Sequence, residues 1–260
     1  MPWLIIVLVV LAVLIGGGII ARKRQLASSR PAFERALAQV EQDLVAAAAS
    51  DRGWDRSVLE AAAREAGVGY RKTITRCAPE DFSTYLAYCA RTIDLSLVPI
   101  RPYDEMHEKV VEGLIFQSGR PLLIFSGGGA DRLSSSFEHA AIAWDHSQQA
   151  TRAVADAMWL LQSVKTVRVF TATDNETSAE RECGEALVKH LAAHGIKAGF
   201  EVIAKSGVSI GKVFEAYVQN SGIDLLVMGA YRHSRLREFF MPGATYTVVG
   251  APPCWVLMSH

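Results

Sequence analysis

Residues 223–257 read IDLLVMGAYRHSRLREFFMPGATYTVVGAPPCWVL, and this stretch decides the fold class. An apolar run ends at Gly229, a basic segment follows at 232–235, and a second apolar run comes after Pro253. A strand, a glycine turn and a helix start form an anion-binding arrangement, because glycine lets a ligand approach the backbone and the first helical amides lack partners. Many such turns bind nothing, so the turn alone does not decide whether a ligand binds here.

Working outward, apolar runs alternate with amphipathic segments through the second half. The expected strands are 139–144, 166–172, 197–204, 223–228 and 255–258, and the expected helices are 147–162, 179–194, 209–220 and 234–240. This alternation predicts an α/β fold with a parallel sheet covered by helices on both faces. Ligands of such sheets bind at the carboxyl ends of the strands, where Gly229 and Asp145 fall.

The first half shows a shorter version of the same pattern. The expected strands are 70–75, 95–98 and 121–125, the expected helices are 31–45, 55–66, 79–90 and 103–117, and the glycine-rich segment 126–130 reads as a linker. Three segments recur in order in both halves: REAGVGYRKTI with AAHGIKAGFEVI, RTIDLSLVP with NSGIDLLVMG, and GRPLLIF with APPCWVL. The repeat predicts two related units.

The first unit is incomplete. It has no counterpart of the strand–helix–strand at 139–172, and Pro99-Ile100-Arg101-Pro102 stands where the second unit has its Gly229 loop. We therefore expect a ligand site only in the second unit. The expected units are a truncated one over 25–130 and a complete one over 131–260.

The N-terminal segment 1–24 predicts a membrane anchor. Residues 1–21 carry no charged side chain, and an apolar run of this length is enough for a transmembrane helix from Trp3 to Ala21. The cluster Arg22-Lys23-Arg24 follows, so the positive-inside rule places the rest of the chain in the cytoplasm, at the inner membrane. A cleaved signal peptide and a buried core segment remain as alternatives.

Composition narrows the function classes. The 27 basic and 27 acidic residues balance, which disfavours a nucleic-acid partner. The 4 cysteines have no metal-ligand or redox-motif spacing, and no nucleophile-elbow, kinase or P-loop pattern occurs. Asp145, His146, His233 and Glu238 could form an acid–base group only if they met. We predict no catalytic residue and no metal site.

These residues resemble the universal stress protein family. The resemblance covers 137–260 in full and 57–127 as a truncated copy. It implies a Rossmann-like, adenine nucleotide alpha hydrolase-like fold with a parallel five-stranded sheet, often paired as dimers or tandem units. ATP-binding members carry an aspartate after the first strand, matched by Asp145, and a loop G-x2-G-x9-G-[S/T] that begins here at Gly229.

The resemblance implies an ATP or other adenine-nucleotide site and a role in stress sensing or regulation. The candidate residues are Trp144, Asp145, Gly229, Ala230, Arg232, His233, Ser234, Gly243, Ala244 and Thr245. Arg232 and Pro242 replace two loop glycines: the first disfavours positive φ and the second lacks an amide. Arg232 and Arg235 could instead contact phosphate.

Two other functions stay open. The chain could be a nucleotide-free protein-interaction module of the same fold, or a nucleotide-hydrolysing or adenylating enzyme, although we expect no enzyme. Partnering is open as well, because the two units could pair within one chain or a free sheet edge could recruit a second copy as a homodimer.

Overall fold

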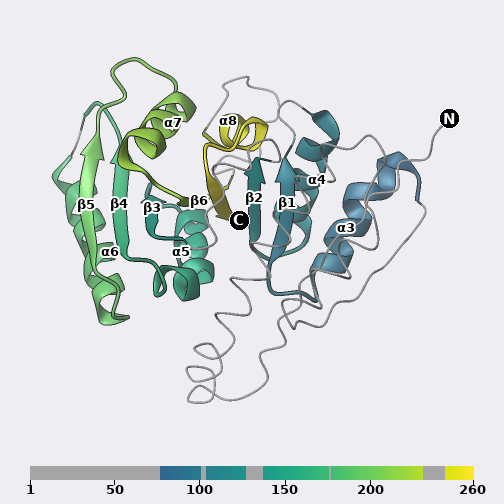
Figure 1. Cartoon of the computed structure of the whole chain (residues 1–260), viewed down its shortest axis with the longest axis horizontal. Coiled ribbons are helices and arrows are strands. Elements are labelled where there is room, and N and C mark those ends of the chain that lie inside the picture. Colours follow the sequence, from purple (N-terminus) through teal and green to yellow (C-terminus); the bar gives the residue numbers. More distant parts are fainter. Residues whose placement is uncertain (1–76, 101–103, 127–136, 176, 231–243) are drawn as a thin grey trace.

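The computed structural model describes residues 77–100, 104–126, 137–175, 177–230 and 244–260 (Figure 1). Its strands are β1 (Ser96–Ile100), β2 (Leu122–Ser126), β3 (His139–Ala143), β4 (Thr166–Ala172), β5 (Ala198–Ile203), β6 (Leu225–Gly229) and β7 (Trp255–Ser259). Its helices are η1 (Pro79–Asp81), α3 (Phe82–Ala90), α4 (Glu105–Gln117), α5 (Gln148–Leu161), α6 (Ser178–Ala193), α7 (Ile210–Ser221) and α8 (Ala244–Gly250).

The strands form one sheet in the order β1-β2-β7-β6-β3-β4-β5. Every neighbouring pair is parallel except β2 and β7, which run antiparallel with Leu123 opposite Leu257. The α/β class is confirmed. The expected sheet of five parallel strands is wrong, because the sheet has more strands and is not all parallel. Strands of both halves join edge to edge at the β2–β7 pair, giving seven strands of mixed direction.

Helices cover both faces of this sheet. One apolar cluster joins α3, α4, α7 and α8 to one face, and it includes Val111, Leu114, Phe214 and Val248. The other cluster joins α5 and α6 to the opposite face through residues such as Leu161 and Leu191. In Figure 1, α3 and α4 accompany β1 and β2 at one end of the sheet, while α5 and α6 accompany β3 to β5 at the other.

The central strands are apolar along their whole length because both of their faces are covered. The sequences LLIFS, HAAIA and LLVMG are buried at nearly every position, which is the pattern of a doubly covered sheet. Helix starts are set by capping side chains: Asp104 accepts amides at the start of α4, and Thr177 forms a capping box with Glu180 at the start of α6.

Several expected elements fall outside the described residues. These are the anchor 1–24, the helices 31–45 and 55–66, the strand 70–75 and the helix 234–240. Within the part of the chain that is described, no helix has the length and apolar character needed to cross a bilayer. The sequence missed α8, whose residues ATYTVVG were expected to be a turn and connection before the last strand.

Candidate functional site

The candidate site lies where β3 and β6 end side by side, with Ala143 paired to Met228. From β3 the chain proceeds through α5 to β4 on one side, and from β6 it proceeds to β7 on the other side. The connections therefore diverge from the carboxyl ends of these two strands. Such a topological switch point is the general place of ligand binding in open α/β sheets.

The segment after β3 builds the start of α5. Asp145 Oδ1 accepts a hydrogen bond from the Ser147 backbone amide at 3.0 Å. Ser147 Oγ in turn accepts from the Ala150 amide at 3.0 Å and caps the helix. Together they fix the N-terminus of a 14-residue helix at the switch point, where its partial positive charge favours anions. Asp145 is a residue that the sequence predicted for this site, whereas the capping role of Ser147 was not predicted.

Glycine is required at position 229 for a reason that differs from the expected one. Its φ lies outside the left-handed region, so positive φ is not what requires glycine here. A Cβ at this position would instead lie 2.4 Å from the backbone nitrogen of Ala150 and 2.7 Å from the carbonyl carbon of Gln149. The end of β6 and the start of α5 thus touch backbone to backbone, which only glycine allows.

Trp144 serves mainly as part of the core. Its amide donates to the Phe170 carbonyl at 2.8 Å, and its own carbonyl accepts from Thr171 Oγ1 at 2.7 Å. Its indole packs against the apolar cluster under α5 and α6. The indole nitrogen is buried and has no hydrogen-bond partner within the described structure. Trp144 therefore packs beside the site with its backbone hydrogen-bonded to Phe170 and Thr171.

His146 lies between the end of β3 and Ser147, the N-cap residue of α5. Its φ is 62°, a left-handed conformation that costs energy for a residue other than glycine. Its ring lies edge-on to Trp144, with centroids 5.6 Å apart. The pKa of the Glu180 carboxyl is lowered, chiefly by hydrogen bonds from Thr177, with a smaller contribution from the charge of His146. Strained residues of this kind concentrate at functional sites.

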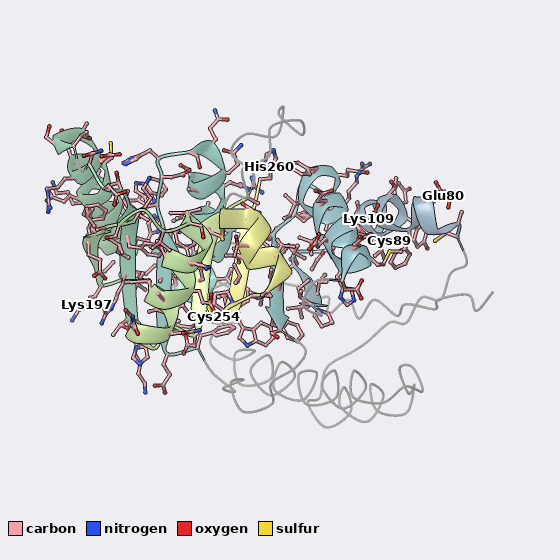
Figure 2. All side chains as sticks on the ribbon, turned by 90° about the horizontal axis from the view of Figure 1, so that it is seen from above. Glu80, Cys89, Lys109, Lys197, Cys254 and His260 are labelled. Carbon is pink, nitrogen blue, oxygen red and sulfur yellow. The ribbon has the colours of Figure 1, made fainter. Side chains whose placement is uncertain are left out.

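The chain end closes the other side of the site. The Ala230 amide donates to the Ser259 carbonyl at 2.9 Å, and the Ala230 carbonyl lies 2.9 Å from His260 Nδ1. The His260 ring packs edge-on against Phe116 of α4, with centroids 4.8 Å apart. Viewed from above, His260 lies between the two ends of the sheet (Figure 2). No sequence signal had pointed to Ser259 or His260.

The structure therefore brings together four of the predicted residues, Trp144, Asp145, Gly229 and Ala230, at the ends of two adjacent strands. Thr245 is buried in α8, which packs on α7 and α4, and Ala244 begins the same helix. Arg232, His233, Ser234 and Gly243 lie outside the described residues, as do Arg235 and Pro242. Of the possible acid–base group, the structure describes Asp145 and His146, whereas His233 and Glu238 lie outside the described residues.

Half-buried ionisable groups at the opposite ends of the strands have structural roles. Asp224 accepts the amides of Glu138 and His139 at 2.6 and 3.0 Å, and burial raises its pKa. Burial also raises the pKa of the Cys254 thiol, which stays protonated and unreactive at neutral pH. No cluster of three or more potential metal ligands occurs among the described residues.

No family model matches the chain, and no curated protein matches its sequence. Solved structures do match. A universal stress protein from Archaeoglobus fulgidus is 15% identical, with 96% of this chain and 83% of that chain covered and a TM-score of 0.60. A putative universal stress protein from Pseudomonas aeruginosa is 13% identical, with 85% and 87% covered and a TM-score of 0.49. At such identities, the first likeness shows a universal-stress-protein-like fold.

Proposed function

We propose that this chain is a membrane-anchored, universal-stress-protein-like regulator that binds ATP or another adenine nucleotide where β3 and β6 end. The observation that carries the proposal is the contact between Gly229 and the capped start of α5. This contact sets the helix N-terminus against the end of β6, so that its first amides and its dipole meet an anion at the switch point.

The proposal assigns binding roles to Asp145, to the start of α5 and to the loop that follows Ala230. Asp145 lies at the β3 end and contacts the adenosine part, as the family resemblance implies. The α5 start and the loop that follows Ala230 hold the phosphates, with Arg232 and Arg235 as charge-assisted donors. No residue is assigned a catalytic role, and the bound nucleotide acts as a signal rather than as a substrate.

The proposal also assigns the two halves to one tandem pair. The antiparallel β2–β7 pairing, centred on Leu123 and Leu257, supports it, because the repeated segments GRPLLIF and APPCWVL supply these strands. In the repeat, Pro99 corresponds to Gly229. A proline ring at that point would block the close helix contact that Gly229 permits, so nucleotide binds in the second half alone.

The membrane anchor in this proposal rests on sequence. The uncharged segment from Trp3 to Ala21 spans the inner membrane, and Arg22-Lys23-Arg24 keeps the folded part in the cytoplasm. Carbonate extraction of membranes from cells producing the full chain tests this point. Retention of the protein in the pellet supports the anchor, whereas release into the supernatant contradicts it.

Titration calorimetry of the full chain in detergent micelles with ATP tests nucleotide binding. Saturable heat near one ATP per chain supports the proposal, and no heat at millimolar ATP contradicts it. GTP is the matched comparison, since it carries the same phosphates on a different base.

The second candidate function is a nucleotide-free interaction module. Arg232 and Pro242 favour it, because they replace the two glycines that would let the loop backbone approach phosphate. The double variant Arg232→Gly, Pro242→Gly separates the two functions. Under this alternative the variant gains ATP binding that the natural chain lacks. Under our proposal the natural chain already binds ATP, and loss of Arg232 weakens binding.

A further inference from the structure

Two histidines lie together on the exposed surface of α6, at the end farthest from the proposed nucleotide site. His190 belongs to the last turn of the helix, and His194 is its C-cap residue, one helical turn further on. Both are exposed, and their ring centroids are 4.8 Å apart. Residues four apart lie on the same helical face, so both rings project from one patch.

This spacing fits two rings bound to a single ion. Zinc lies about 2.0–2.1 Å from a histidine nitrogen, which places each ring centroid about 3 Å from the metal. If both rings bind one metal ion while their centroids stay 4.8 Å apart, the two metal-to-centroid lines enclose an angle of about 100° at the metal. That angle lies between those of square-planar and tetrahedral coordination. The rings now stand at 62° to each other, and exposed side chains reorient within nanoseconds.

The local backbone favours a cation at this point. The C-terminus of the 16-residue helix α6 carries the negative end of the helix dipole. The end itself is well fixed: the His194 amide donates to the carbonyls of Leu191 and Ala192, and Gly195 leaves the helix at a φ of 79°. Gln162 of the α5–β4 connection donates to the His194 carbonyl at 3.3 Å, which ties the site to the rest of the domain.

We propose that His190 and His194 chelate one late first-row divalent cation, such as Cu²⁺ or Zn²⁺, at the end of α6. Imidazole is a preferred ligand of both ions, and Cu²⁺ is the more tightly bound in the Irving–Williams series. The described residues supply no third histidine, cysteine or carboxylate to this pair, so water or an external ligand completes the coordination.

This site is independent of the nucleotide site. Helix α6 begins after β4, at the edge of the sheet where β3 and β6 end, and it rises about 1.5 Å per residue, so its last turn lies about 20 Å away. Lys197, three residues beyond His194, lies at the outer end of the sheet, away from His260 (Figure 2). Metal binding therefore tests nothing about ATP, and either proposal can fail alone.

Calorimetric titration of the full chain with CuCl₂ and separately with ZnCl₂ tests the proposal. The natural chain should bind one ion. The variants His190→Ala and His194→Ala should each bind it roughly 100-fold more weakly, because one of the two chelating rings is gone. The control His139→Ala removes a half-buried histidine whose Nδ1 lies 2.8 Å from Thr166 Oγ1, and it should leave the binding unchanged.

Nitrogen hyperfine splitting in the electron paramagnetic resonance spectrum of the Cu²⁺ form gives a second readout. Two coordinated imidazoles are expected in the natural chain and one in each single variant. Because both side chains are exposed, alanine at either position should preserve the fold, which circular dichroism checks. The proposal is overturned if the double variant binds either ion as tightly as the natural chain, or if no ion binds.

Discussion

A Cβ added at Gly229 would lie 2.4 Å from the backbone nitrogen of Ala150, so β6 and the start of α5 meet without any side chain between them. This contact joins the two strand ends of the candidate site into one rigid edge. The residue type at 229 is thus dictated by helix packing, and any nucleotide site at this edge depends on that packing.

Gly229→Ala should therefore destabilise the fold, by about 3 kcal/mol, because backbone atoms on two elements would have to move apart. Gly199→Ala is the matched control, since nothing lies within 4 Å of its added Cβ, and it should change stability by less than about 0.5 kcal/mol. Urea unfolding followed by tryptophan fluorescence measures both. Equal stabilities for the two variants would contradict the packing role of Gly229.

Ser147→Ala removes the side chain that caps α5 and should cost about 1 kcal/mol. Ser209→Ala offers a control at the same helix position, because Ser209 is the N-cap residue of α7 but makes no side-chain capping bond. The same urea experiment should show the smaller loss for Ser209→Ala. A larger loss at Ser209 than at Ser147 would speak against the assigned cap.

Tyr217→Phe tests a half-buried hydrogen bond, and its effect should depend on pH. The Tyr217 hydroxyl donates to Glu201 Oε1 at 2.6 Å, and burial followed by this bond raises its pKa. The Tyr217 hydroxyl therefore keeps its proton in the folded chain at pH values above about 10, where the unfolded chain releases it. This contribution to stability is complete below that pH and falls as pH rises toward the raised pKa.

The variant should lose about 1–2 kcal/mol at neutral pH and show a shallower fall in stability above pH of about 10. Tyr88→Phe serves as the control, because Tyr88 is 66% exposed and should behave like the natural chain. Denaturation midpoints measured across alkaline pH give the comparison. Identical alkaline slopes for Tyr217→Phe and the natural chain would refute the linkage.

Asp145→Ala should weaken ATP binding roughly tenfold or more, because a charged hydrogen-bonding group is worth about 1.5–3 kcal/mol. Asp104→Ala is matched to it: Asp104 also accepts backbone amides before a helix, but it belongs to the first half of the chain. Calorimetry should show unchanged ATP affinity for that control. If both variants bind ATP like the natural chain, Asp145 has no part in the site.

Much of the fold was readable from the sequence because its signals are local. The buried strands 139–143 and 225–229 are short apolar runs, and the helices between them carry capping residues such as Thr177. The joining of both halves into one sheet was left open, since an antiparallel contact between β2 and β7 depends on the whole assembled edge. Helix α8 was missed because Thr, Tyr and Val favour strands and Gly243 indicates a turn.

The site was predicted in part for the same reason. Asp145 and Gly229 were found because each follows an apolar run at a strand end. The physical role of Gly229 was not readable, because the approach of Ala150 comes from a helix far away in the chain. The contacts of Ser259 and His260 with Asp156, Ala230 and Phe116 are likewise long-range and leave no local pattern.

Photoaffinity labelling of the full chain with 8-azido-ATP, followed by peptide mapping, tests the central claim most directly. The account predicts that label lies on peptides containing Trp144 to Ser147 or the segment after Gly229, and that excess ATP prevents the labelling. Label confined to the first half, or labelling that ATP does not reduce, would contradict an adenine-nucleotide site at the ends of β3 and β6.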